Sequence, residues 1–209
     1  MENDWPDLGR YREENRKIGL PAEGEDRIVF MGNSITEGWG RACPDFFIKN
    51  SYINRGISGQ TTPQMLLRFR ADVIKLKPSV VVILAGINDI AGNTGPSTPE
   101  MIQDNLASMA ELARAHGISV ILCSVLPARD FPWRPGLEPA GKVIEINKWI
   151  RSYAQKNGHT YLDFFSAMAD TDGGMKSGYS NDEVHPTEAG YRVMGTLAGE
   201  AIRKALKDM

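Results

Sequence analysis

Ser34, Asp182 and His185 are three residues whose types and spacing suit a nucleophilic reaction. Ser34 stands just after the apolar run "RIVFMG" at 27–32, whereas Asp182 and His185 lie three residues apart near the end of the chain. A serine hydroxyl becomes an effective nucleophile when a histidine accepts its proton and a carboxylate fixes the tautomer of that histidine. Because one turn of chain brings residues three apart to the same side, Asp182 and His185 are spaced to act as such a pair. Each residue taken alone also fits a structural role, as a helix cap for Ser34 and as a turn or capping residue for the other two.

Two further residues are suited to stabilise the negative charge that acyl transfer places on a carbonyl oxygen. Gly59 lies in "ISGQTT" and Asn88 in "GIND", and each segment follows an expected strand. The backbone N–H of Gly59 and the side-chain amide of Asn88 would supply two donors to an oxyanion hole, with the N–H of Ser34 as a third. Alternatively, Gly59 supplies a positive φ and Asn88 is a turn residue. The occurrence of all these residues in order, each at the end of a strand, favours the catalytic interpretation.

The elements that must position these residues alternate between strands and helices. Nearly continuous apolar runs are typical of parallel strands buried on both faces, and helical patterns separate them. Strands alternating with helices predict a parallel sheet covered by helices on both faces. In such sheets the ligand site lies at the carboxyl ends of the strands. The expected strands are 27–32, 51–56, 79–86, 118–125 and, more weakly, 159–164; the expected helices are 62–76, 98–115, 140–157 and 187–207.

The last helix, 187–207, is expected to be opened by Pro186, because proline is well suited to the start of a helix. This interpretation places His185 at a helix start. The whole chain, 1–209, is expected to form one domain, since 209 residues suffice for one sizeable core. Residues 1–26 are expected to be a leading surface helix and a linker.

Composition argues against several classes of partner. A net charge of −2 gives no electrostatic basis for binding nucleic acid. No apolar run approaches the roughly 20 residues that a membrane-spanning helix needs. Cys43 and Cys123 lie far apart, and the three histidines are scattered, so neither a disulfide framework nor a metal site is expected.

The amino terminus is acidic and polar rather than basic and apolar, so the chain as written is expected to be cytoplasmic. A leader peptide removed from the chain would instead make the protein periplasmic or secreted. The sequence does not indicate an oligomeric state.

The segments "GNSIT", "NRGISGQTT", "GIND" and "DEVHPT", taken together, resemble the four sequence blocks of the SGNH (GDSL-type) serine hydrolases. The resemblance implies a flavodoxin-like, three-layer α/β/α sandwich whose five-stranded parallel sheet has the order 2-1-3-4-5. It also implies Ser34 as nucleophile, His185 as base, Asp182 as orienting carboxylate, and an oxyanion hole of Ser34, Gly59 and Asn88. We expect no cofactor. One departure is Asn33, which stands where the family usually has aspartate and keeps its hydrogen-bonding shape without its charge.

The resulting hypothesis is an esterase that works through an acyl-serine intermediate on a small-molecule ester substrate. The polar segments that flank the motifs favour a short acyl group, such as acetyl on a carbohydrate or a small alcohol. A lysophospholipase, a thioesterase and a catalytically silent carbohydrate-binding protein on the same fold are alternatives.

Three residues are candidates for substrate binding. Trp133 and Arg134, in the Pro-rich segment "LPARDFPWRPGLEP" at 126–139, pair an aromatic face with a hydrogen-bonding fork, as a sugar would require. Trp39 follows Ser34 by about one turn and is expected to serve similarly. The alternative for Trp133 is that it packs this segment onto the body of the protein.

Overall fold

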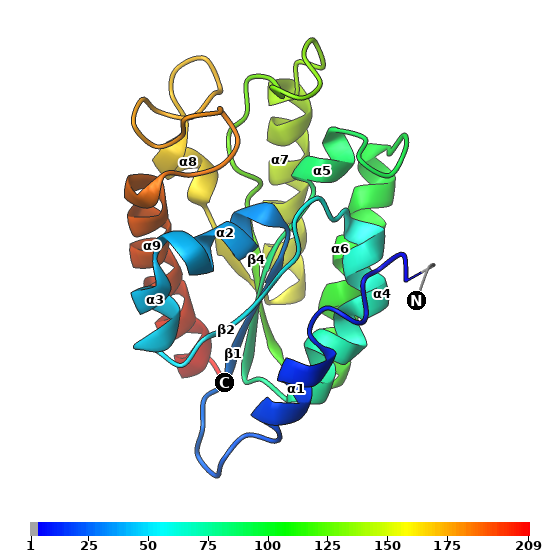
Figure 1. Cartoon of the computed structure of the whole chain (residues 1–209), viewed down its shortest axis with the longest axis vertical. Coiled ribbons are helices and arrows are strands. Elements are labelled where there is room, and N and C mark those ends of the chain that lie inside the picture. Colours follow the sequence, from blue (N-terminus) through cyan, green and yellow to red (C-terminus); the bar gives the residue numbers. More distant parts are fainter. Residues whose placement is uncertain (1–3) are drawn as a thin grey trace.

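A computed structural model describes residues 4–209, and in this range five parallel strands form one sheet. The sheet order is β2-β1-β3-β4-β5, with β1 and β3 buried along their whole length. Burial on both faces explains why these strands are continuously apolar in sequence. The predicted fold class is therefore confirmed (Figure 1). The strands are β1 (Ile28–Gly32), β2 (Ile53–Gly56), β3 (Val80–Leu84), β4 (Ser119–Cys123) and β5 (Thr160–Leu162).

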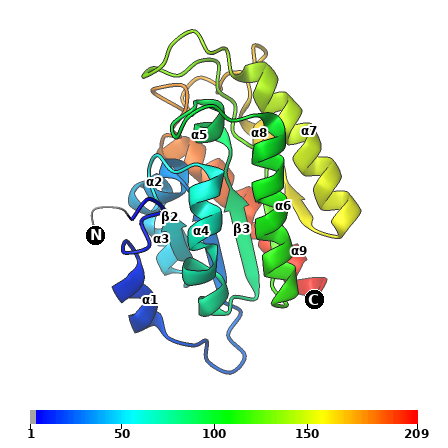
Figure 2. The ribbon, with the colours of Figure 1, turned by 90° about the vertical axis from the view of Figure 1, so that its right-hand side faces the viewer.

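Helices cover both faces of the sheet. One layer packs around the last helix of the chain and contains α2 (Ser34–Ala42), α3 (Pro44–Ile48), α8 (Phe164–Met168) and α9 (Glu188–Lys207). The other layer contains α1 (Arg12–Ile18), α4 (Thr62–Asp72), α6 (Pro99–Ala115) and α7 (Ala140–Asn157). Figure 2 shows α4 and α6 side by side against the sheet.

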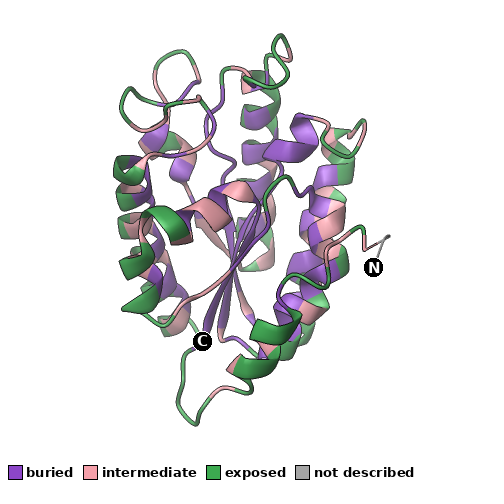
Figure 3. Ribbon diagram, viewed as in Figure 1, coloured by how far each residue is buried: buried purple, intermediate pink, exposed green. Residues whose placement is uncertain are grey.

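Burial follows these layers. The strands and the inward faces of the helices are buried, whereas the outward helix faces and most loops are exposed (Figure 3). Nearly all of the buried apolar side chains form one continuous cluster, so both helix layers share a core with the sheet. Among residues 4–209, no helix has the length and hydrophobicity that crossing a membrane requires.

Most expected elements match the structure, with differences at their ends. The expected helix 62–76 ends as an α-helix at Asp72 and continues as the short 3₁₀ helix η1 (Ile74–Leu76). The helix after the first strand, for which no bounds were expected, is α2. Three shorter helices, α3, α5 (Ile87–Ile90) and α8, had no counterpart among the expected elements, because four or five residues are too few to show a helical period. The expected leading helix is present as α1, and residues 1–3 lie outside the described range.

The prediction that Pro186 opens the last helix is wrong. The N-cap of α9 is Thr187, whose hydroxyl accepts the backbone N–H of Gly190 at 3.3 Å. A threonine hydroxyl can accept one of the unpaired backbone N–H groups in the first turn of a helix. Proline cannot do so, because its side chain has no hydrogen-bond acceptor. Pro186 instead forms an isolated β-bridge with Ser180.

Candidate active site

Ser34 is the first residue of α2 and lies at the carboxyl end of β1. The helix is capped by its neighbour Asn33, whose Oδ1 accepts the backbone N–H of Ile35 at 3.0 Å. The capping role that was the alternative for Ser34 is therefore filled by Asn33. The turn also needs glycine at position 32, because a Cβ there would lie 2.0 Å from Thr36 Oγ1 and 2.9 Å from the carbonyl oxygen of Leu84.

Hydrogen bonds connect Ser34, His185 and Asp182 in a line. Ser34 Oγ lies 2.9 Å from His185 Nε2, and His185 Nδ1 lies 2.7 Å from Asp182 Oδ2. The structure thus brings together side chains that are 151 residues apart in sequence. A histidine bonded on one side to a hydroxyl and on the other to a carboxylate can accept the hydroxyl proton.

The loop before α9 wraps backbone donors around Asp182. Asp182 Oδ1 accepts the N–H groups of Val184 at 3.0 Å and His185 at 2.7 Å, and Glu183 adopts a positive φ of 67° to allow this turn. Partial burial by itself raises the pKa of Asp182, but the hydrogen bonds from the backbone and ring of His185 and from the backbone of Val184 together outweigh it and hold the pKa below its usual value. The carboxylate is therefore kept ionised beside the histidine.

Ser180 also supports this loop and was not singled out from the sequence. Its hydroxyl lies 2.8 Å from the carbonyl oxygen of His185 and 3.1 Å from Asp182 Oδ1. The only available signal was a serine two residues before the aspartate. That spacing is too common in turns to be informative.

The proposed oxyanion residues lie shortly after β2 and β3, the two strands that flank β1. Gly59 has a φ of 78°, as its alternative role in a turn requires, and Asn88 is buried within α5. The Nδ2 atom of Asn88 donates to the carbonyl oxygen of Gln60 at 2.9 Å, and Asn93 Nδ2 donates to that of Gly59 at 3.2 Å. These bonds join the loop after β2 to α5 and to the loop that follows α5. Both segments lie at the edge of the sheet where β1 ends at Gly32, two residues before Ser34.

An open cavity of about 520 Å³ adjoins Ser34 and His185, and Arg41, Ser58 and Tyr191 also line it. Glu37 accepts hydrogen bonds from the backbone N–H and the hydroxyl of Ser58. A larger hollow of about 780 Å³ lies between α3 and α9. We assign the site to the smaller cavity, because it alone of the two contains the serine–histidine pair.

Trp133 lies beside this pair. Its ring centroid is 6.1 Å from that of His185 and 5.3 Å from that of Phe131, and the tryptophan is 46% exposed whereas Phe131 is fully buried. The residue therefore packs partly against its own loop and remains exposed beside the histidine. The contact with Phe131 agrees with the packing interpretation of Trp133, whereas a role in substrate binding stays a prediction.

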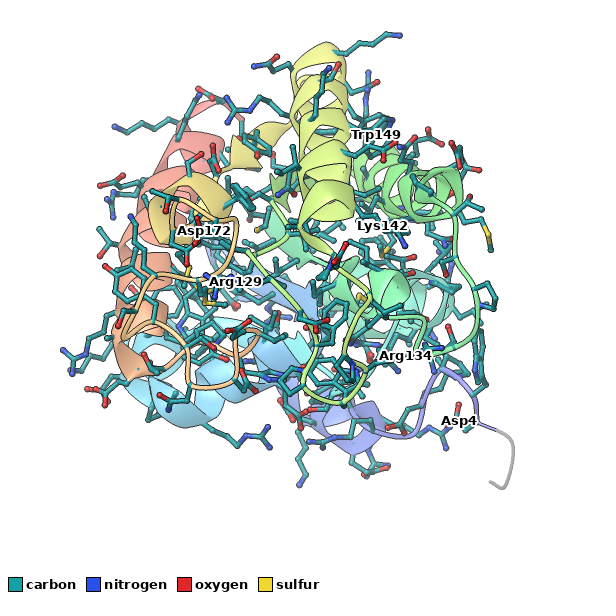
Figure 4. The ribbon with its side chains drawn as sticks, turned by 90° about the horizontal axis from the view of Figure 1, so that it is seen from above. Asp4, Arg129, Arg134, Lys142, Trp149 and Asp172 are labelled. Carbon is teal, nitrogen blue, oxygen red and sulfur yellow. The ribbon has the colours of Figure 1, made fainter. Side chains whose placement is uncertain are left out.

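Arg134 contacts the loop that follows β3. Its Nη1 donates to the carbonyl oxygens of Ala91 at 2.6 Å and Gly92 at 3.1 Å. In the view from above, Arg134 and Arg129 both lie on the loops over the sheet edge (Figure 4). At least one nitrogen of Arg134 thus serves to fix the 126–139 segment rather than to meet a substrate.

The expectation that Trp39 faces substrate is wrong. The side chain is 1% exposed and stacks on Phe46, with ring centroids 4.8 Å apart, and on Tyr191 at 5.8 Å. It points from α2 toward α9 rather than toward the cavity, because the inward face of α2 must fill the core between these helices.

Residues 4–209 contain no group of three or more His, Cys, Asp or Glu side chains that could hold a metal ion.

A serine, a histidine and an aspartate connected in this order at the carboxyl edge of a parallel sheet form the arrangement found in serine hydrolases. The chain belongs to the GDSL-like Lipase/Acylhydrolase family, whose sequence profile matches residues 30–193. The resemblance found in the sequence motifs is confirmed, and so, at the level of the family, is the class of ester hydrolases.

Relatives and solved structures agree with this family. A putative acylhydrolase from Bacteroides fragilis has a similar structure, with a TM-score of 0.96 and 47% identity over 98% of this chain and 99% of that one. The esterase TesA of Pseudomonas aeruginosa is 35% identical over 79% of this chain and 78% of its own length. An acetylxylan esterase of Xylanibacter ruminicola is 28% identical over 94% of this chain and 46% of its own length. The chain spans about half the length of several curated relatives that it matches.

Proposed function

We propose that this protein hydrolyses carboxylic esters through an acyl-serine intermediate. The observation that carries the proposal is the line of hydrogen bonds from Ser34 Oγ to His185 Nε2, at 2.9 Å, and from His185 Nδ1 to Asp182 Oδ2, at 2.7 Å. Membership of the acylhydrolase family supports the same reaction. A catalytically silent binding protein would not need to preserve this line.

In the proposed mechanism, Ser34 Oγ attacks the ester carbonyl carbon while His185 Nε2 takes the hydroxyl proton. The carbonyl oxygen becomes an oxyanion, which the N–H groups of Ser34 and Gly59 and the amide of Asn88 stabilise. Collapse of the tetrahedral intermediate expels the alkoxide, which receives the proton from His185. Water then attacks the acyl-serine by the same route, with His185 as base, and releases the carboxylic acid.

We further propose a short acyl group, such as acetyl, on a carbohydrate or a small alcohol. Trp133 is exposed and lies beside His185, and an aromatic ring at this place suits the apolar face of a sugar ring. The cavity next to Ser34 is open and has Arg41 and Ser58 in its lining, whereas a long acyl chain would need an enclosed apolar channel. One relative is itself named an acetylxylan esterase. A thioesterase or lysophospholipase is the alternative within the family.

The test is a series of p-nitrophenyl esters of increasing acyl length, from acetyl to octanoyl, together with labelling by a serine-directed phosphonate. We expect hydrolysis that is fastest for the short chains and a phosphonate adduct at Ser34. The Ser34→Ala variant should fold normally and show neither hydrolysis nor adduct, because the three residues act as one unit. Near-normal turnover by this variant would refute the mechanism, and faster turnover of octanoyl esters would favour a lipid or thioester substrate.

A further inference from the structure

Gln60 occupies the centre of a buried network next to the proposed oxyanion hole. The residue is 3% exposed and directly follows Gly59. Its side-chain Nε2 donates to the carbonyl oxygen of Pro6 at 2.8 Å, and its Oε1 accepts Nε of Arg68 at 2.5 Å. Its backbone carbonyl oxygen accepts Asn88 Nδ2 at 2.9 Å. Gln60 therefore joins the leading segment and α4 to α5, which carries Asn88.

Arg68 connects this network to the strand ends. It is fully buried, and its Nη2 donates to the carbonyl oxygens of Gly32 at 3.0 Å and Arg55 at 2.9 Å. Gly32 ends β1, and Arg55 is the penultimate residue of β2. Nη1 of Arg68 forms an ion pair with Asp72 at 3.0 Å. The arginine thus fixes, relative to one another, the strands that lead to Ser34 and to Gly59.

The chemistry of these groups makes the network rigid. A buried guanidinium is costly unless its donors are satisfied, and a fully satisfied buried network favours a single geometry. The amide of Asn88 is planar and carries two donors. Because one donor is committed to the carbonyl oxygen of Gln60, the orientation of the amide, and with it the direction of the second donor, depends on where that carbonyl lies.

We infer that Gln60 is a positioning residue for the reaction: its side chain, anchored by Arg68 and by the Pro6 carbonyl, holds its own backbone carbonyl where it orients the Asn88 amide toward the developing oxyanion. This inference rests on the proposed function. Gln60 touches no reacting atom and acts through Asn88.

The test is a double-mutant cycle on kcat for p-nitrophenyl acetate. Gln60→Met keeps the volume of the side chain and removes both of its hydrogen bonds, so kcat should fall about 10- to 100-fold with KM nearly unchanged. In the Asn88→Ala background the same change should lower kcat by less than about threefold, because the group through which it acts is gone. Equal losses in both backgrounds, an unchanged kcat, or an effect confined to KM would overturn the inference.

Two further variants separate positioning from folding. Gln60→Glu keeps an acceptor for Arg68 and is expected to retain more kcat than Gln60→Met, and it also serves if the methionine variant fails to fold. Gln64 is the matched control: its Nε2 donates to the carbonyl oxygen of Trp5 at 2.7 Å, but it has no bond to Asn88. Gln64→Met is expected to change thermal stability. Any effect that it has on kcat should be the same in the parent and in the Asn88→Ala background. If Gln60→Glu lost as much kcat as the methionine variant, or if Gln64→Met reproduced its coupling to Asn88, the inference would fail.

Failure of the inference is distinguishable from failure of the proposed function. If Asn88→Ala alone left kcat unchanged, Asn88 would not be an oxyanion donor, and both statements would fall. If Asn88→Ala lowered kcat but the effect of Gln60→Met were independent of it, the proposed function would stand and only the positioning role would be refuted.

Discussion

Asp182 holds His185 through both of its carboxylate oxygens. Oδ2 lies 2.7 Å from the ring Nδ1, and Oδ1 accepts the backbone N–H of the same histidine, also at 2.7 Å. The ring and the backbone of His185 are thus fixed by one side chain. An ionised carboxylate can only accept a hydrogen bond, so the Nδ1 atom of His185 must carry the proton and donate it to Asp182. The lone pair of Nε2 then faces Ser34 Oγ.

Asp182→Asn should therefore lower kcat by about 10⁴-fold, because an amide no longer requires the productive tautomer of the histidine. Most of the fold should persist, since Oδ1 can still accept the N–H groups of Val184 and His185. Steady-state kinetics together with circular dichroism would check this. The control is Glu183→Gln, which changes the adjacent, exposed carboxylate and should leave kcat intact. A loss of less than tenfold in Asp182→Asn would mean that something else orients His185.

Asn88→Ala should lower kcat by about 10²–10³-fold with little change in KM, the usual consequence of removing one oxyanion donor. The reason is that the charge on the carbonyl oxygen develops in the transition state rather than in the bound ester. Initial rates over a range of p-nitrophenyl acetate concentrations separate the two constants. If only KM rose, Asn88 would bind substrate without stabilising the transition state.

The sheet and the site positions were predictable because they depend on local patterns. Continuous apolar runs indicate buried parallel strands, and parallel strands of a doubly wound sheet bring their carboxyl ends to one edge. Ser34, Asn88 and His185 follow from motifs at such ends. The order of the strands came from the family resemblance, since hydrophobic periodicity does not tell which strands are neighbours.

Other features depend on tertiary packing and could not be read from local pattern. Trp39 lies about one turn past Ser34, yet the packing of α2 against α9 decides that it faces the core. The contacts of Gln60 with Pro6 and Asn88 join segments 54 and 28 residues away. No periodicity of a single element encodes such contacts.

Asn33 variants should separate the capping role from the charge that the family usually has at this position. Asn33→Ala removes the acceptor for the Ile35 N–H and should lower stability by about 1 kcal/mol. Asn33→Asp keeps the acceptor. The variant loses the Nδ2 atom of Asn33, but this atom has no hydrogen-bond partner among residues 4–209. Thermal unfolding should rank the aspartate variant above the alanine variant. An alanine variant as stable as the parent would show that the cap contributes nothing.

Trp39→Ala should destabilise the protein by about 3–5 kcal/mol, the usual cost of deleting a buried aromatic side chain. The ring of Trp39 packs between Phe46 and Tyr191, so its removal would leave a buried cavity. Urea unfolding measures this loss. If the variant were as stable as the parent but bound substrate poorly, the buried position of Trp39 would be contradicted.

Trp133→Ala should have the opposite profile, with little loss of stability and a raised KM for acetylated sugars. The side chain is 46% exposed and its ring lies 6.1 Å from that of His185, so its removal exposes little core but takes an aromatic face from the site. The KM for p-nitrophenyl acetate, which has no sugar ring, should rise less. Equal weakening of both substrates would argue against a carbohydrate ester as substrate.

Asp89 should make the stability of the fold depend on pH in a direction opposite to that of most carboxylates. Burial raises its pKa to about 6, even though the backbone N–H and the hydroxyl of Thr62 both donate to it. The folded state therefore binds this proton more tightly than the unfolded state does. The contribution of the group to stability is fully present below about pH 4 and is lost as the pH rises through about 6, by at most about 3 kcal/mol.

The comparison that isolates this effect is the parent protein against Asp89→Asn, because an amide does not titrate and the other carboxylates are common to both. The free energy of unfolding, measured in urea between pH 4 and pH 7, should favour the parent most at the acidic end, and the difference should shift toward the amide variant as the pH rises. Asn88 precedes Asp89 in α5, so the rate of hydrolysis is not the readout of choice. A difference in stability that stays constant over this range would show that Asp89 titrates alike in the folded and unfolded states.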